Sequence, residues 1–168
     1  MTLTPPGDED PVRDSELPSL AADVKYEVAM ATFAGHQLLH AEVQRTPAGH
    51  NAFIEVFLLH VRNLADFFDA RPTKDDVVAS HYVADWSATR DSEPRAREAQ
   101  ENLRSQCRWI NKRLAHITAT RQREPKELDA RLITDVMREI AILFQLFVDN
   151  LSDEQRSWFR AGEPHDLD

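Results

Sequence analysis

Glycine and cysteine are scarce in this chain. Four glycines and one cysteine occur among 168 residues. So few glycines argue against β architectures, which are rich in tight turns. Because Cys107 is the only cysteine, no internal disulfide is possible and a thiolate-rich metal site is excluded. The composition likewise excludes collagen-like, disulfide-stabilised and wholly disordered proteins.

Long apolar runs and targeting signals are also missing. The most apolar stretches, 56–59 and 141–148, are far shorter than the roughly 20 residues that span a bilayer. No basic region followed by an apolar stretch stands near the N-terminus, so we expect no signal peptide. These features predict a cytoplasmic protein without membrane association, and no motif in the sequence calls for a cofactor.

Charge is unevenly distributed. The chain has a formal net charge of −9, and residues 1–18 contribute five acids and one base. Residues 90–126 instead contain ten bases and five acids. The acidic total disfavours broad, non-specific binding of nucleic acid. The basic segment is a candidate for a local RNA contact, although a solvated helix face would have the same composition.

Helical periodicity dominates the chain between two polar ends. Residues 1–18 combine four prolines with acids, which predicts a disordered acidic tail. Residues 19–160 form the predicted helical bundle domain, and 161–168 a frayed tail. Apolar residues recur at helical spacing over about 19–45, 51–70, 92–120 and 125–150. The clearest stripe is that of the third segment: Ala99, Leu103, Cys107, Ile110, Leu114 and Ile117.

Capping boxes predict two further short helices. Thr73-x-x-Asp76 would open a helix that runs to about Tyr82, and Ser152-x-x-Gln155 would open a final one. In that final helix, Trp158 and Phe159 are expected to dock on the core. Four long amphipathic helices with short links describe an all-α, four-helix bundle with added short helices.

Polar residues interrupt the otherwise apolar second helix. Arg62 and Asp66 are four residues apart, so they share a face and can form an ion pair. His60 instead lies on the apolar face, where it loses solvent and needs a hydrogen-bonding partner. Asn63 stands beside Arg62. This pattern suits either a satisfied structural histidine with a helical ion pair, or a small reactive site.

The third helix carries a second polar group. His116 and Trp109 are seven residues apart and share a face, while Asn111 lies on the opposite flank. His116 could serve as a general base, as a ligand, or as a buried donor that fixes helix packing.

Histidine spacing offers one candidate for a metal site. His36 and His40 are four residues apart on the first helix, so both imidazoles share a face. A third ligand could come from His60 or His116 on a neighbouring helix. Because the chain contains seven histidines, such pairs also arise by chance, and we predict no metal centre from this spacing alone.

The pairing of Arg62-Asn63 on one helix with His116 on another resembles the HEPN superfamily. That resemblance implies a small all-α bundle, often dimeric, and for many members metal-independent RNA cleavage in toxin–antitoxin or phage-defence systems. The family's signature places a histidine four to six residues after the arginine. This chain has Phe67 there, flanked by Asp66 and Phe68. Segments 58–68 and 110–118 are also similar to small bacterial proteins of unassigned role.

Three hypotheses follow from these residues. The first is a non-enzymatic interaction module that binds a protein partner or itself, in which Arg62, Asn63, Asp66 and His116 form a buried polar cluster that fixes helix register. The second is a metal-independent RNase, in which Arg62 holds a phosphate, His116 acts as acid or base, and Asn63 or Asn111 orients them. The third is a metal-binding bundle that uses His36, His40 and a third histidine.

Overall fold

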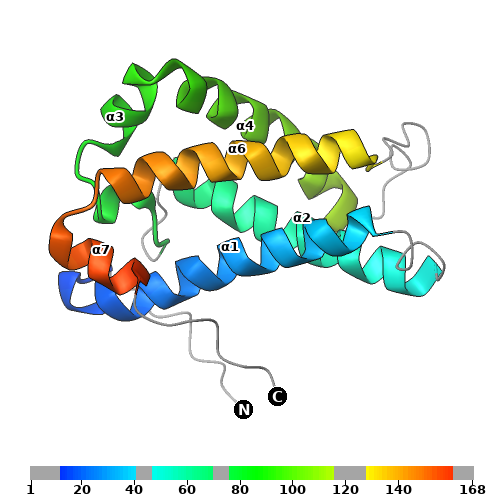
Figure 1. Ribbon diagram of the computed structural model, residues 1–168, viewed down its shortest axis with the longest axis horizontal. Coiled ribbons are helices and arrows are strands. Elements are labelled where there is room, and N and C mark those ends of the chain that lie inside the picture. Colours follow the sequence, from blue (N-terminus) through cyan, green and yellow to red (C-terminus); the bar gives the residue numbers. More distant parts are fainter. Residues whose placement is uncertain (1–11, 41–46, 70–75, 116–127, 161–168) are drawn as a thin grey trace, which may run out of the picture.

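The chain folds into a bundle of helices (Figure 1). The computed structural model describes residues 12–40, 47–69, 76–115 and 128–160, without the side chains of 108, 109 and 111–115. Within these ranges all regular structure is helical, which confirms the predicted all-α class. The elements are η1 (Asp14–Glu16), α1 (Leu17–Leu39), α2 (Pro47–Asp69), η3 (Ala79–His81), α3 (Trp86–Ser92), α4 (Pro94–Ala115), α6 (Ala130–Asp149) and α7 (Asp153–Arg160).

The four long helices surround one core. Helix α1 packs against α2, α6 and α7, whereas α4 packs against α2, α6 and α3. Helices α1 and α4 therefore lie on opposite sides of the α2 and α6 pair (Figure 1). One side of α1 faces the core and the opposite side is left to solvent. Among the described residues, no helix has the length and apolar character needed to cross a membrane.

Helix α1 begins earlier than the sequence predicts. Its first residue, Leu17, is buried, and Tyr82 Oη donates a hydrogen bond of 3.1 Å to the Leu17 carbonyl. Pro18 fits the first turn because its missing N–H would have no partner there. The end of the predicted acidic tail thus belongs to the bundle, while residues 1–11 and 161–168 lie outside the described part.

The short helices differ most from the prediction. The helix expected from Thr73 to Tyr82 is wrong over its described part, because 76–78 are not helical and only Ala79–His81 form a 3-10 turn; Thr73 lies outside the described residues. Helix α3 was not predicted at all, since its seven residues are too few for a periodic signal. It closes the end of α2: Trp86 Nε1 and Arg90 Nη1 donate to the Phe68 carbonyl at 2.9 and 3.1 Å. A helix-terminal carbonyl is thereby satisfied inside the core.

The other helix boundaries follow local capping chemistry. Helix α2 begins at Pro47, four residues before the predicted start. Helix α6 begins after Asp129, whose Oδ1 accepts a 2.7 Å hydrogen bond from the Leu132 amide. The capping box that opens α7 is confirmed, because the Ser152 amide donates to Gln155 Oε1 at 3.0 Å and the Gln155 amide to Ser152 Oγ at 3.2 Å.

Aromatic rings fill the core where α2, α3, α6 and α7 meet. Phe147 is fully buried, and its ring makes edge-to-face contacts at centroid distances of 5.3 Å with Phe67, 5.9 Å with Trp86 and 5.2 Å with Phe159. Edge-to-face contacts of this kind add to the burial energy of the rings. The predicted docking of the final helix through Phe159 is therefore confirmed.

Candidate functional site

Arg62 and Asn63 stand on α2, outside the core. Arg62 Nε lies 3.7 Å from Asp66 Oδ2, so the predicted pair exists. The Arg62 side chain is partly exposed, however, and Asn63 and Asp66 are exposed. The prediction that these residues form a buried cluster is wrong, because the inward stripe of α2 runs through Val61, Leu64, Ala65 and Phe68.

The buried polar contact between α1 and α2 involves His60 instead. The His60 side chain is buried, and its Nδ1 lies 2.7 Å from Glu27 Oε2 on α1. Asn63 Nδ2 donates to the same oxygen at 3.0 Å, and the Tyr26 ring packs edge-on against the imidazole. The expectation that His60 needs a partner is met, with the imidazole N–H donating to the carboxylate.

Glu27 is the residue that the sequence did not single out. It lies beside the buried stripe of α1 formed by Val24 and Ala31. The position of a carboxylate next to an apolar stripe indicates that Glu27 is partly buried and needs a partner. It does not indicate which helix supplies that partner. That partner comes from 33 residues further along the chain.

The α4 side of the predicted reactive site, with His116 and Asn111, cannot be compared with the prediction. His116 lies outside the described residues. Asn111 belongs to α4, but its side chain is also outside the description. The convergence of Arg62 and His116 therefore stays a prediction.

The three described histidines considered for a metal site do not gather. His36 of α1 and His40, directly after it, are exposed, whereas His60 is buried against Glu27. Among the residues that the structure describes, no three His, Cys, Asp or Glu side chains are placed to hold a metal ion.

An acidic cleft adjoins Arg62. It has a volume of about 390 Å³ and is lined by three carboxylates, Asp66, Asp69 and Asp76. Partial burial raises the pKa of Asp66, and Asp76 and Asp69 raise it further, while Arg62 lowers it. Asp69 is bonded to Arg104 of α4. The cleft is therefore a poor site for a phosphate, which three nearby carboxylates would repel.

A smaller and more apolar cleft lies between α1 and α2. It has a volume of about 140 Å³, and Asn63 lines both clefts. Its walls include Leu20, Val24 and Leu64, with Asp23 and Glu27 at its edge. Neither cleft brings a nucleophile next to a free base among the described side chains.

Exposed hydrophobic side chains gather on one side of the molecule. Across the described ranges, the large hydrophobic residues with high exposure all belong to α1 or α2: Tyr26, Phe33, Leu39 and Leu59. Phe33 and Leu59 are 50% and 46% exposed, although the Phe33 ring also contacts Phe53 at 5.9 Å. Leu39 stands apart at the end of α1. We define the outer face as the other three with their half-buried neighbours on the same helices: Tyr26, Met30, Phe33, Phe53, Val56 and Leu59.

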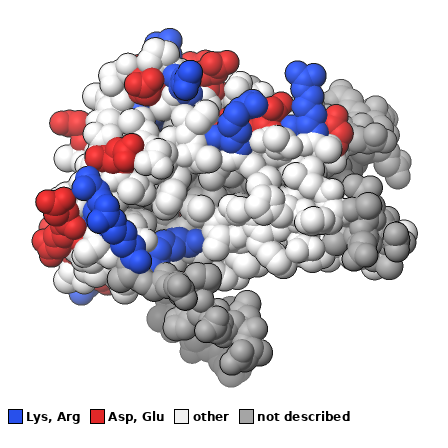
Figure 2. All heavy atoms as spheres, viewed as in Figure 1, with Lys and Arg blue, Asp and Glu red and all other residues white. Residues whose placement is uncertain are grey.

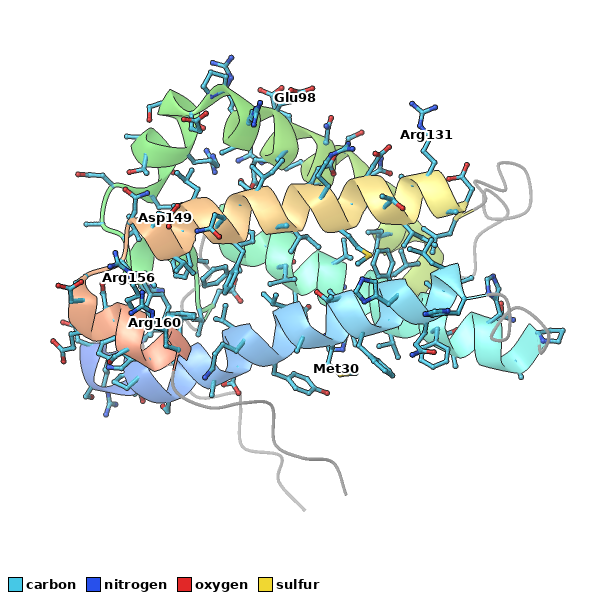
Figure 3. All side chains as sticks on the ribbon, viewed as in Figure 1. Met30, Glu98, Arg131, Asp149, Arg156 and Arg160 are labelled. Atoms are coloured by element: carbon cyan, nitrogen blue, oxygen red, sulfur yellow. The ribbon has the colours of Figure 1, made fainter. Side chains whose placement is uncertain are left out.

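Charge is sparse on the neighbouring α1 and α6 side, whereas Lys25 of α1 and Glu55 of α2 border the outer face. Figure 2 shows a broad area without Lys, Arg, Asp or Glu over the middle of the molecule, where α1 and α6 lie in Figure 1. In Figure 3, Met30 projects from α1 on the side away from α6. The outer face is thus directed to solvent rather than into the bundle.

Comparisons with known proteins give no family. No family model matches the chain, and neither the curated proteins nor the solved structures contain a match.

Proposed function

We propose that this bundle is an intracellular interaction module that binds a protein partner through the outer face. The observation that carries the proposal is the confinement of exposed large hydrophobic residues, among those described, to α1 and α2. Apolar side chains scattered singly over a surface need no explanation, but a contiguous apolar group marks an interaction site. Aromatic residues such as Tyr26 and Phe33 are also enriched in the buried centres of protein interfaces.

The Glu27–His60–Asn63 contact supports this role. It joins the two helices that form the outer face through a buried, charge-assisted hydrogen bond. Helices held in one register present their exposed side chains in a fixed arrangement, which lowers the entropy cost of binding. We infer that this contact fixes helix register, a role that the sequence assigned to a cluster around Arg62.

The surroundings of Arg62 weigh against the nuclease alternative. Arg62 is paired with Asp66, and Asp69 and Asp76 line the adjoining cleft. Phosphate binding would have to overcome these carboxylates. In the basic segment, Arg90 and Arg104 are already paired with Asp91 and Asp69. Binding of RNA through residues 90–126 stays a prediction.

Site-specific photocrosslinking in cells tests the proposed function. Phe33 is replaced by benzoylphenylalanine, and the matched control carries the same group at Ser105, an exposed position on α4. We expect a discrete crosslinked species from position 33 and none from position 105. Equal crosslinking at the two positions, or none at position 33, would contradict the proposal.

A further inference from the structure

The solvent side of α1 has the residue spacing of a helix-packing seam. Its outward residues are separated alternately by four and three positions, all are exposed, and small and aromatic side chains alternate: Ala22, Tyr26, Ala29, Phe33 and His36. This spacing is that of the a and d positions of a heptad, which place side chains into the gaps of a facing helix. We call these five residues the α1 seam. All five remain exposed among the described residues, although the Tyr26 and Phe33 rings touch His60 and Phe53 of α2 at one edge.

The α1 seam also lacks charge. From Val28 to its end at Leu39, α1 contains no Asp, Glu, Lys or Arg. In a twofold-symmetric contact, a residue near the axis meets its own copy, so any charge there would face a like charge. The chain as a whole carries −9, which makes two copies repel elsewhere. Two copies can therefore approach each other along this uncharged stretch. A partner of opposite charge would find no charged residues there to steer its binding.

We propose that the outer face binds a second copy of this chain, with the two α1 helices packed antiparallel about an axis near Ala29. This inference rests on the proposed function and names the partner. Antiparallel pairing about Ala29 sets Tyr26 of one copy within one residue of the level of Phe33 of the other, because they lie three and four positions from Ala29. Ala29 has only a methyl group, so it lets the two helix backbones come close at the axis.

The available area matches a stable contact. A helix of 23 residues is about 35 Å long at 1.5 Å per residue. Neighbouring helices lie about 10 Å apart, so α1 and α2 side by side form a strip about 20 Å wide with a surface on the order of 700 Å². An ordinary stable complex buries about 800 Å² on each partner. The α1 seam with the outer face is therefore large enough for a dimer.

Cysteine crosslinking tests the register of the proposed pair. Ala29→Cys places two thiols near the twofold axis, and a short bismaleimide would join them. Ser105→Cys, on α4, is the matched exposed control. Native Cys107 does not compete, because it is buried and burial raises the pKa of its thiol to about 12. We expect most of the Ala29→Cys protein to form a covalent dimer, with Ser105→Cys and the unmodified chain at background.

Sedimentation equilibrium on the intact chain provides the second readout. We expect a concentration-dependent dimer whose dissociation constant rises at least tenfold in Phe33→Glu, an effect typical of a central aromatic residue. Ser105→Glu, which adds the same charge on α4, should leave the constant unchanged. Circular dichroism confirms that both variants keep their helices.

The outcomes separate this inference from the proposed function. A monomer at all concentrations, or equal crosslinking at positions 29 and 105, overturns the second copy as partner. If Phe33 photocrosslinks in cells to a different protein, the interaction module stands without self-association. If position 33 gives no adduct and the chain is monomeric, both proposals fail.

Discussion

Phe147 and Phe33 represent two regions of this molecule that differ in what covers them. Phe147 lies in the core where α2, α3, α6 and α7 meet, and it is fully buried among other rings. Phe33 lies on α1, is half exposed and touches one ring, that of Phe53. Burial of an apolar side chain stabilises the folded chain, whereas an exposed apolar side chain contributes little to the free energy of folding. The core region therefore accounts for folding, and the α1 region keeps apolar surface available for binding.

The two phenylalanines should separate stability from association. Phe147→Ala removes a ring from the packed core and should lower the free energy of unfolding by about 3–5 kcal/mol. Phe33→Ala should cost less than about 1 kcal/mol in dilute solution, because a half-exposed ring loses little burial. Urea denaturation at low protein concentration measures both. Similar losses for the two variants would show that α1 contributes to the core more than its exposure indicates.

The contact between α1 and α2 gives the next largest effect. Glu27→Ala leaves the buried His60 Nδ1 without its acceptor and should cost about 1–3 kcal/mol. Arg62→Ala breaks only the exposed pair with Asp66, which should cost no more than about 1 kcal/mol. Thermal unfolding compares the two variants. If Arg62→Ala were as damaging as Glu27→Ala, the assignment of the register contact to Glu27 and His60 would be wrong.

The inner side of α1 should respond to a single added methyl group. A Cβ built on Gly35 would lie 2.5 Å from Met137 Sδ and 3.0 Å from Phe57 Cε2. Gly35→Ala should therefore cost about 1–3 kcal/mol through overpacking, although alanine alone favours helix. Adding Met137→Ala makes room, so the double variant should lose less than the sum of the two single losses. Strict additivity in urea titrations would argue against this close approach.

Periodicity predicted which residues face the core but not which helices meet. The stripe Ala99, Leu103, Cys107 and Ile110 of α4 is buried as expected. In contrast, Glu27 could not be named as the partner of His60, because spacing along one helix fixes a face and carries no information on the neighbour of that face. Helix α3 was missed for a related reason. This short helix is held in place by tertiary contacts, namely the hydrogen bonds that Trp86 and Arg90 donate to α2.

The same limit explains the misplaced site around Arg62. Arg62, Asn63 and Asp66 interrupt an apolar helix, and the sequence suggested that they were buried. Helix α2 is instead a partly exposed helix whose outer side carries these residues. The outer face was missed for the opposite reason. Tyr26 and Phe33 are residue types that usually face a core, yet they are exposed. Only the packing of α1 shows that its two apolar sides differ in exposure.

The smallest expected effect concerns a carboxyl group between α4 and α6. Glu139 is buried, and burial raises its pKa above the ordinary value; Asp135 and Glu98 raise it further, while a hydrogen bond from Asn102 and the charge of Arg138 lower it. The folded chain thus binds this proton more tightly than the unfolded chain does. Stability is lost as pH rises from the ordinary carboxyl pKa to the raised one, and it stays lower at pH 7.

Glu139→Gln removes that cost and should therefore raise the melting temperature at pH 7. At about pH 3.5, where the Glu139 carboxyl is mostly protonated in both the folded and the unfolded chain, the variant and the parent chain should melt alike. Glu101→Gln, at an exposed position of α4, is the control and should change little at either pH. A Glu139→Gln gain of equal size at both pH values would point to packing rather than to the buried charge. Unlike Phe33→Glu, this change lies between α4 and α6, away from the α1 seam, so it should leave dimer dissociation unaltered.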